Sequence, residues 1–281
     1  MRRVPDWHNS RAILSIAGSD PSGGAGIQAD LKTFTAIGVY GGAALTCLTT
    51  QNSLGVSSCL PLAPEFVKKQ IQLVLSDLPV SHVKTGMLGT DKIAGAIAEA
   101  LYNFAGEVIC DPVLTASDGH ELFRQTKRQT GLQALLNTAS VLTPNLPELA
   151  ILVNNKLETS QDAVKAATVL LARHPKLRAI VLTGGHLREQ AKEVEDFLIL
   201  RQDISPKILT AKHARLITSN THGTGCTFAS AFAAYHLLHG NDQDAFFKAV
   251  AFMDTVLRQS ASLALGKGKG PLAHHLFRGK T

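Results

Sequence analysis

A cysteine follows directly on a run of glycines in the segment Asn220-Thr-His-Gly-Thr-Gly-Cys226, and a helix of small residues is predicted after it. Glycines let consecutive backbone amides point at one spot, and a helix N-terminus adds about half a positive charge. The segment therefore predicts an anion site. A thiol beside those amides is expected to have a lowered pKa and a chemical role. The alternative is a buried apolar cysteine at a helix start, but the glycines and His222 favour the functional interpretation.

A second glycine-rich segment covers residues 18–26, between a predicted strand and a predicted helix. It contains a formal match to the dinucleotide-binding fingerprint, which needs an acidic residue about 20 positions further on to bind the ribose. No acid occurs between Asp30 and Glu65, so the dinucleotide hypothesis fails. No Gly-Lys-Ser/Thr closes the segment, which also excludes a Walker-type phosphate loop. A backbone-exposing turn with Asp20 and Asp30 beside it remains, and its alternative is a purely structural turn.

Oxygen-bearing side chains follow two further predicted strands. Asp111 comes directly after Val-Ile-Cys, and Asn145 and Glu148 follow a strand that ends in Leu-Thr-Pro. Carboxylates at strand ends supply oxygen ligands that suit Mg²⁺ with bound phosphates. Either acid could instead cap a helix, and Glu148 alone would be interpreted that way. His274 and His275 have no third partner nearby in the sequence, so no metal site is predicted there.

The composition bounds the class of protein. The 281 residues are 45% hydrophobic and 18% charged, which excludes a disordered chain. The net charge of +6 is mildly basic, but no run of five like charges exists, so no nucleic-acid partner is expected. Glycines and polar residues interrupt the uncharged segment 33–64 before about 20 apolar residues accumulate, so no membrane partner is expected. The four cysteines form no C-x-x-C, and reduced thiols in a cytoplasmic protein are the simplest interpretation.

Strands and helices that alternate along the chain must position these residues. Short apolar runs without polar alternation predict strands buried on both faces at Ala12–Ala17, Ala43–Thr50, Val80–Lys84, Val108–Cys110, Val141–Thr143 and Ala179–Leu182. Amphipathic stretches predict helices at Ile27–Ile37, Glu65–Leu75, Ile93–Tyr102, Leu132–Leu136 and Ala163–Leu171. This alternation predicts right-handed crossovers and a mostly parallel sheet covered on both faces. Ligands bind such sheets beyond the carboxyl ends of the strands, where the segments described above lie.

The last third of the chain departs from this alternation. A final antiparallel pair of strands is predicted at Phe197–Leu200 and Leu216–Thr218. Two long helices follow, over about Thr224–Leu238 and Asp244–Leu263. No internal repeat or long linker interrupts the pattern, so one continuous domain is expected.

Taken together, these segments resemble the hydroxymethylpyrimidine and phosphomethylpyrimidine kinase family of thiamine biosynthesis, within the ribokinase-like superfamily. The resembling residues run in family order over nearly the whole chain: Ala17-Gly-Ser-Asp-Pro-Ser-Gly-Gly-Ala-Gly-Ile-Gln-Ala-Asp-Leu-Lys-Thr-Phe34, Gln51-Asn52, Lys84-Thr-Gly-Met-Leu88, Asp111-Pro-Val113, Thr143-Pro-Asn-Leu-Pro-Glu148, Gly184-Gly-His186, Thr221-His-Gly-Thr-Gly-Cys226 and Gly266-Lys-Gly-Lys-Gly-Pro271. The resemblance implies an α/β fold, namely the ribokinase-like three-layer αβα sandwich with a mostly parallel central sheet. It implies a single kinase domain over residues 12–275, with residues 1–11 as an N-terminal extension.

The resemblance also implies a function. The chain would be an ATP- and Mg²⁺-dependent kinase that phosphorylates the hydroxymethyl group of 4-amino-5-hydroxymethyl-2-methylpyrimidine and then converts the monophosphate to the diphosphate. The residues around the pyrimidine would be Gly18, Asp30, Gln51, Met87 and Val113. The residues at the nucleotide would be Asp111, Thr143, Asn145, Thr183 and Lys267. The metal would be held by Glu148 and Asp111, and the enzyme would be a cytoplasmic homodimer.

Catalysis would centre on Cys226, which stands where most ribokinase relatives have an aspartate base. The amides that form the anion hole beside it would be those of Gly223, Thr224 and Gly225. Pyridoxal kinase is an alternative, because it shares the superfamily and an aromatic hydroxymethyl substrate. A catalytically silent pyrimidine-binding sensor is a second alternative.

Two departures from the family pattern remove cations near the phosphates. The family usually has Ala-Lys-Ser-Gly-Asp after Asp-Pro-Val, whereas Ala116 is followed here by Ser-Asp-Gly-His. The family usually has Lys-Gly-Gly-His, whereas Thr183 precedes the two glycines here. Lys267 and Lys269 are the cations that would compensate. The missing lysine at Thr183 allows the sensor alternative, while Cys226 and Glu148 argue against it.

Overall fold

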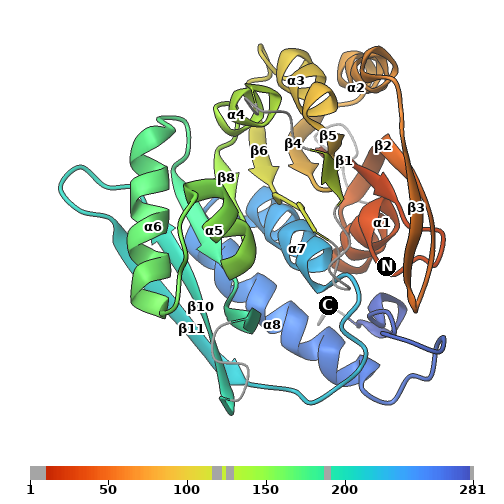
Figure 1. Cartoon of the computed structure of the whole chain (residues 1–281), viewed down its shortest axis with the longest axis vertical. Helices are drawn as coiled ribbons and strands as arrows, with labels where there is room; N and C mark the ends of the chain where they lie inside the picture. Colours follow the sequence, from red (N-terminus) through yellow and green to blue (C-terminus); the bar gives the residue numbers. More distant parts are fainter. Residues whose placement is uncertain (1–10, 116–121, 125–129, 187–190, 279–281) are drawn as a thin grey trace, which may run out of the picture.

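The computed structural model describes residues 11–115, 122–124, 130–186 and 191–278 (Figure 1). The N-terminal extension predicted over residues 1–11 therefore lies almost wholly outside the described residues. Within them, nine strands form one sheet in the order β11-β10-β9-β8-β6-β4-β1-β2-β3. The strands are β1 (Ala12–Ser19), β2 (Tyr40–Asn52), β3 (Gly55–Pro61), β4 (Val80–Thr85), β6 (Glu107–Cys110), β8 (Val141–Leu142), β9 (Ala179–Leu182), β10 (Glu193–Leu200) and β11 (Lys207–Ala214). A separate pair comprises β5 (Gly89–Thr90) and β7 (Phe123–Arg124).

The six central strands, from β9 across to β2, all pair in parallel, as the buried apolar runs predict. Antiparallel strands close both edges, with β3 paired to β2 on one side and β10 and β11 on the other. The parallel strands all point their carboxyl ends at one edge of the sheet. The loops that follow them carry the first glycine-rich segment and the strand-end acids. The second glycine-rich segment follows β11, which runs in the same direction as β9, so the predicted site residues meet at that edge.

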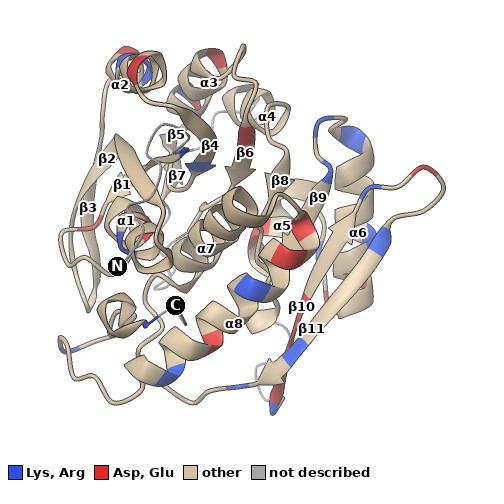
Figure 2. Cartoon of the chain, turned by 180° about the vertical axis from the view of Figure 1, so that it is seen from behind, with Lys and Arg blue, Asp and Glu red and all other residues tan. Residues whose placement is uncertain are grey.

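Helices cover both faces of the sheet and give two separate hydrophobic cores. One core contains residues of α2 (Pro64–Asp77), α3 (Asp91–Ala100), α4 (Thr130–Leu136), α5 (Leu146–Val153) and α6 (Ser160–Arg173). The other contains residues of α1 (Gly26–Ile37), α7 (Thr224–His239) and α8 (Asp242–Ser260). The three-layer αβα sandwich is therefore confirmed. Helix α7 carries no Asp, Glu, Lys or Arg and is buried along most of its length (Figure 2).

The short strands β5 and β7 were not predicted, and the two strands of the main sheet that the sequence pattern missed lie at its edges. Strand β11 is Lys207–Ala214, so the predicted strand at Leu216–Thr218 is wrong. Strand β3 was not predicted at all. Both strands are largely exposed and lack a continuous apolar run, because an edge strand needs little burial to keep its hydrogen bonds to one neighbour. None of the helices in the described part of the chain has the length and apolar character that a membrane span requires.

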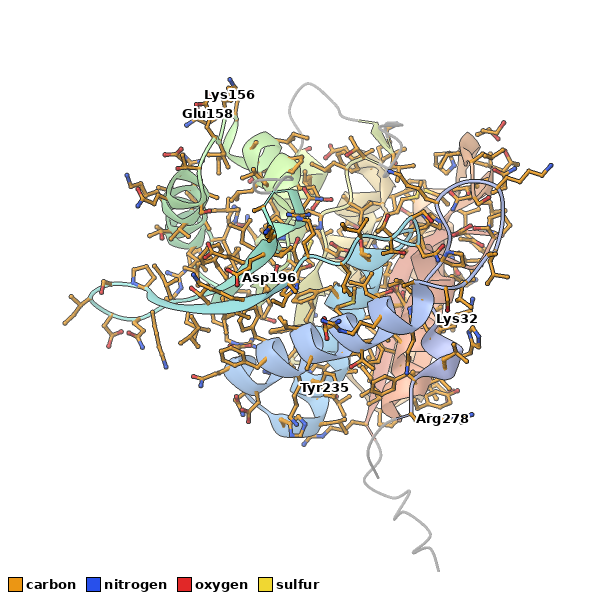
Figure 3. All side chains as sticks on the ribbon, turned by 90° about the horizontal axis from the view of Figure 1, so that it is seen from below. Lys32, Lys156, Glu158, Asp196, Tyr235 and Arg278 are labelled. Carbon is orange, nitrogen blue, oxygen red and sulfur yellow. The ribbon has the colours of Figure 1, made fainter. Side chains whose placement is uncertain are left out.

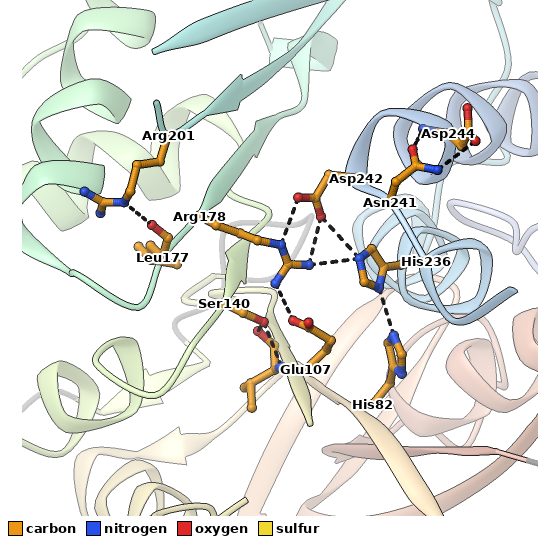
Figure 4. A network of polar contacts seen from close by, with 11 residues as sticks. His82, Glu107, Ser140, Leu177, Arg178, Arg201, His236, Asn241, Asp242 and Asp244 are labelled. Atoms are coloured by element: carbon orange, nitrogen blue, oxygen red, sulfur yellow. Dashed lines mark hydrogen bonds and ion pairs between the residues drawn. The ribbon is translucent and has the colours of Figure 1, made fainter. Parts of the chain in front are cut away.

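A partly buried polar network joins the amino ends of the strands, opposite the glycine-rich loops (Figure 4). Arg178 donates to both oxygens of Asp242 at 2.9 Å and pairs with Glu107. It also donates to Nε2 of His236 at 3.0 Å, and Nδ1 of His236 lies 2.9 Å from Nε2 of His82. Because a guanidinium only donates, His236 accepts at Nε2 and must donate from Nδ1 to His82. Both imidazoles are therefore held in their neutral forms.

The neutral histidines predict a loss of stability in acid. Burial lowers the pKa of His82 to about 4, and burial together with Arg178 lowers the pKa of His236. An unfolded histidine titrates near pH 6.5, so the unfolded chain binds more protons than the folded chain between about pH 4 and 6.5. The stabilisation is complete above this window and is lost as the pH falls through it. For His82 alone, we expect the free energy of unfolding to drop by about 2–3 kcal/mol between about pH 7.5 and 4.5.

Urea unfolding of the wild type at the two pH values measures this drop, and His82→Gln should show less of it. His239→Gln is the matched control, because His239 is exposed on the same helix as His236. If His82→Gln loses as much stability in acid as the wild type, the neutral-histidine assignment is wrong.

Candidate active site

The two glycine-rich segments lie against each other, and Asp20 joins them. Its carboxylate accepts hydrogen bonds from the amides of Gly24 and Ala25 at 3.0 and 2.8 Å and from the amide and hydroxyl of Ser22. Nε2 of His222, in the other segment, lies 2.8 Å from the same carboxylate. Burial acts to raise the pKa of Asp20, but the bonds from His222, Ser22 and Ala25 outweigh it and hold the pKa far below its ordinary value. Asp20 is thus an ionised clamp between the segments.

The segments approach so closely that side chains are excluded at the contact. Gly223 has φ +83°, and a Cβ atom there would lie 1.9 Å from the carbonyl oxygen of Gly24. A Cβ atom on Gly24 would lie 2.4 Å from the His222 ring. Glycine is required at both positions for this packing. The purely structural alternative therefore explains why the segment 18–26 contains a glycine at position 24. The same contact places this segment beside the start of α7.

Cys226 lies in the first turn of α7, where Gly223 is the N-cap residue. The amides of a first helical turn have no partner within the helix, so those of Gly225 and Cys226 are free to face an anion, while that of Thr224 makes a long bond of 3.4 Å to the Thr221 carbonyl. The Cys226 sulfur accepts a hydrogen bond from the amide of Gly26, the first residue of α1. Two helix N-termini therefore meet at this thiol, which is buried although the residue as a whole keeps some exposed surface.

The expectation of a lowered pKa at Cys226 is wrong. Burial raises the pKa of the Cys226 thiol to about 12, and the charge of Lys84 lowers it by less than burial raises it. Asp30 and Asp111 add a further increase. The side chain is therefore a thiol at neutral pH in the free protein. Sequence reasoning considered the helix N-terminus but could not show the carboxylates and the desolvation around the sulfur.

A buried ion pair between Asp30 of α1 and Lys84 of β4 lies one helical turn beyond Gly26 and Cys226. No role for Lys84 was predicted from the sequence pattern. Lys84, at 0% exposure, donates to the two Asp30 oxygens at 3.0 and 3.2 Å. The hydroxyls of Ser15 and Ser230 donate to Asp30 at 2.6 and 2.7 Å. Burial alone would lower the pKa of Lys84, but Asp30, with Cys226 and Asp111, raises it above its ordinary value. The available signal was a lysine at the end of the predicted strand Val80–Lys84.

Asp30 has no exposed surface, and all the contacts just described are with protein groups. Its predicted contact with the pyrimidine stays a prediction. Asp30 lies four residues after Gly26 on α1. Ser230 lies four residues after Cys226 on α7. Residues four apart share a helix face, so the Asp30–Ser230 bond repeats, one turn deeper, the contact between Gly26 and Cys226.

Two carboxylates, Asp111 after β6 and Glu148 in the first turn of α5, are both buried. Burial raises the pKa of Asp111 to about 6 despite Lys84, whose Nζ lies 3.7 Å from one Asp111 oxygen. Burial and Asp111 raise the pKa of Glu148 well above its ordinary value. That Asp111 oxygen has no hydrogen bond among the described residues. An unbonded carboxylate oxygen beside a second acid fits a divalent cation, which would relieve the repulsion between the two acids.

The predicted nucleotide residues gather around these acids. Thr143 donates to Asp111 at 3.4 Å. Asn145 and Glu148 form a reciprocal capping box at the start of α5, with both bonds at 2.9 Å. Asn145 also pairs with Thr183 in an isolated bridge, so β8 and β9 carry this part of the site side by side. The helix-cap interpretation of Glu148 is therefore confirmed, and it leaves one Glu148 oxygen outside the capping bond.

A small apolar cluster lies apart from the two main cores. It consists of buried Cys47, Met87 and Leu122 with partly buried Val56, Cys59 and Val113. Gly18, at the end of β1, adjoins it, since a Cβ atom there would lie 2.8 Å from the Met87 sulfur. Gln51 is half-buried and is the register partner of Val56 in the β2–β3 hairpin. The structure thus brings Gly18, Gln51, Met87 and Val113 together.

Lys267 is held at the tip of the same hairpin. The amides of Lys267 and Gly268 donate to the Ser53 hydroxyl at 2.9 and 3.2 Å. The contacts that the structure shows for Lys267 therefore place it near the hairpin that carries Gln51, and its contact with the nucleotide stays a prediction. The altered residues 117–120 lie outside the described residues.

The fold and these loops define a ribokinase-like kinase. A solved pyridoxal kinase from Staphylococcus aureus in complex with ADP has a TM-score of 0.83 and 31% identity, covering 96% of each chain. A phosphomethylpyrimidine kinase structure from Clostridium difficile has a TM-score of 0.74 and 31% identity, covering 88% of this chain and all of that one.

Sequence comparison identifies the family within the ribokinase-like kinases. The family model described as phosphomethylpyrimidine kinase matches residues 20–273. The hydroxymethylpyrimidine/phosphomethylpyrimidine kinase of Escherichia coli K12 is 40% identical over 263 residues, which cover 93% of this chain and 96% of that protein. This chain belongs to the phosphomethylpyrimidine kinase family, and the resemblance deduced from its motifs is confirmed.

Proposed function

We propose that this chain is an ATP- and Mg²⁺-dependent kinase that phosphorylates 4-amino-5-hydroxymethyl-2-methylpyrimidine and then its monophosphate. The observation that carries the proposal is the convergence of three features at the carboxyl edge of the sheet. These are the α7 N-terminus with Cys226, the buried acids Asp111 and Glu148, and the apolar cluster that contains Met87 and Val113. Family membership supports this choice of substrate, because relatives covering most of the chain are named for both activities.

Cys226 and the amides beside it would act on the phosphoryl group and on the hydroxyl that receives it. The amides of Gly223, Thr224 and Gly225, together with the α7 dipole, would hold the oxygens of the transferring phosphoryl group. Cys226 Sγ, in the same turn, would accept the proton that leaves the hydroxymethyl group when the side chain is in its thiolate form, and would become the thiol. The Asp20–His222 clamp would keep this turn in place.

The acids and the α5 N-terminus would bind the nucleotide. Thr143, Asn145 and Thr183 would contact its phosphates, and Asp111 and Glu148 would hold Mg²⁺. The described residues contain no group of three or more acids, histidines or cysteines placed to hold a metal. Phosphate oxygens and water would therefore complete the coordination, as is usual for Mg²⁺. Bound there, the ion would neutralise phosphate charge.

The pyrimidine would lie against the apolar cluster, with Gln51 at its polar edge. An amide can donate to and accept from an aminopyrimidine at the same time. Gly18 would line the same side of the pocket, because it packs so closely on Met87 that a side chain there would meet the Met87 sulfur.

Replacing Gln51 by Ala should weaken pyrimidine binding by about 1–3 kcal/mol, because a buried polar edge of the ligand loses its partner. Calorimetric titration with the pyrimidine measures the change. Gln72→Ala is the control, since Gln72 is an exposed glutamine on α2. Unchanged affinity in Gln51→Ala would remove Gln51 from the binding site.

One assay separates the candidate functions. ADP release is measured with the hydroxymethylpyrimidine, with its monophosphate and with pyridoxal as the sole acceptor. Turnover of both pyrimidines, with pyridoxal the poorer substrate, supports the proposal. The likeness to pyridoxal kinases favours pyridoxal as the second candidate, and preferred turnover of pyridoxal would establish it. Pyrimidine binding without any turnover would establish the sensor, which Thr183 in place of the usual lysine allows.

We further propose that the enzyme is a cytoplasmic homodimer. The four cysteines are all free, which suits a reducing compartment. Leu48 and Leu60, register partners on the edge hairpin, are 42% and 63% exposed and form an apolar pair that a second copy would cover. Light scattering should give about twice the chain mass, and Leu60→Lys should lower it.

A further inference from the structure

The turn after β9 is built against the strand beyond it. This turn, the short helix η2 (Gly184–His186), directly follows Thr183. The amide of Gly184 donates to an oxygen of Asp196 at 2.7 Å. A Cβ atom on Gly184 would lie 1.9 Å from the carbonyl oxygen of Glu195, so only glycine fits. The position of the turn is therefore fixed by β10, a strand that carries none of the residues assigned to the site.

Asp196 is only 6% exposed, and both of its oxygens have partners. Figure 3 labels it beside the ribbon of β10. Its second oxygen lies 3.0 Å from Nε2 of His213 on β11. The hydrogen bond to Asp196 raises the pKa of His213 more than burial lowers it, and Asp254 on α8 raises it further. Asp196 therefore connects a backbone amide to an imidazole that gains a proton readily.

These contacts extend to the proposed nucleotide residues. Thr183 pairs with Asn145 in the isolated bridge, and its amide donates to the carbonyl of Pro144 at 3.3 Å. On the other side, the Arg215 guanidinium donates to the carbonyls of Gly185 and Ala191 at 3.1 and 3.0 Å. The turn is thus tied to the α5 N-terminus by Thr183 and to Arg215, the residue that follows β11, by the Gly185 carbonyl.

We propose that Asp196 and His213 are positioning residues for the nucleotide: they fix the Gly184 turn beside Asn145, and the charge on His213 offsets that of Asp196 so that the pair does not repel the phosphates. The inference rests on the proposed function, which places the nucleotide at Asn145 and Thr183. The groups that face His213 are Asp196 from β10 and Asp254 from α8. Lys212, the preceding residue on β11, pairs with Glu195 instead. When His213 loses its proton, the negative charge of Asp196 is no longer balanced.

Two variants separate the positioning of the Gly184 turn by Asp196 from the effect of the charge on His213. Asp196→Ala leaves the Gly184 amide without its buried acceptor, and we expect the Kd for ATP to rise roughly tenfold or more. His213→Gln keeps a donor toward Asp196 but not the charge, and we expect a rise of about two- to fivefold at pH 7. The KM for the pyrimidine should stay within about twofold in both, which a general loss of structure would not produce. Lys212→Gln, beside His213 but in a largely exposed ion pair, should match the wild type in every measurement.

The test is calorimetric titration of each full-length variant with ATP and Mg²⁺ in the absence of the pyrimidine, from pH 7 to pH 9. In the wild type the Kd should rise with pH as His213 deprotonates, and in His213→Gln it should stay flat. Equal pH dependence in the two proteins, or wild-type affinity in a folded Asp196→Ala, would overturn the inference. If Asp196→Ala does not fold, His213→Gln still decides. A wild type that does not bind ATP would overturn the proposed function itself.

Discussion

Replacing Cys226 by Ala is expected to lower kcat by about 10²–10⁴-fold, the usual contribution of a positioned general base. A primary alcohol is a poor nucleophile at neutral pH, so transfer benefits when its proton has an acceptor. Pyrimidine affinity should stay within a few-fold, because the loss belongs to the transition state. Steady-state kinetics with saturating ATP, together with calorimetry for the pyrimidine, measure the two quantities separately.

The raised pKa of Cys226 adds an expected pH dependence of kcat to this prediction. With a pKa of about 12, the thiolate fraction increases by about tenfold for each pH unit across the neutral range. The wild-type kcat should therefore rise with pH, and Cys226→Ala should lose that dependence. Cys226→Asp should recover part of the rate at neutral pH, since a carboxylate is already ionised there. A wild-type pH profile that Cys226→Ala retains would count against the base.

Cys226→Ser distinguishes the base from a purely structural acceptor. A serine hydroxyl still accepts the hydrogen bond from the Gly26 amide, but it is a far weaker acid than a thiol and yields almost no anion. The serine variant should therefore be nearly as slow as the alanine variant. Near wild-type turnover in either of them would reduce Cys226 to packing, and the anion hole would then have to account for catalysis by positioning alone.

Replacing Lys84 by Met is expected to destabilise the protein by about 3–5 kcal/mol, because it leaves the buried Asp30 carboxylate without its cation. The two serine hydroxyls that donate to Asp30 would offset only part of this cost. Because α1 and α7 meet through Asp30 and Ser230, the N-terminal turns of both helices should lose their fixed geometry. Urea unfolding at neutral pH measures the loss of stability, and kcat should fall with it.

A double variant tests the cause. Removing both charges in Asp30→Asn with Lys84→Met should recover much of the stability, since neutral partners need no counter-ion. Lys68→Met is the matched control, because Lys68 pairs with Glu99 at 2.7 Å on the surface, and it should leave the unfolding midpoint unchanged. If the single Lys84→Met variant were as stable as the wild type, the Asp30 charge could not depend on Lys84.

The sequence by itself determined the class of fold and the order of the site segments. Uninterrupted apolar runs that alternate with amphipathic stretches allow one arrangement, a parallel sheet with helices on both faces, because each strand must be buried twice. The glycine-rich segments were equally readable, since few residues other than glycine tolerate the close approach at Gly24 and Gly223. Edge strands β3 and β11 were not predicted, because few of their residues are buried and they carry no continuous apolar run.

Only the tertiary structure decided the electrostatics of the site. Asp20 and His222 are far apart in the chain, and so are Asp30 and Ser230, yet each pair forms a direct hydrogen bond. The charge state of Cys226 follows from the same cause: local sequence places it at a helix N-terminus, which favours a thiolate, but folding surrounds it with buried carboxylates and removes water. A pKa depends on every charge and on the solvent within several ångströms, and a linear pattern does not contain those distances.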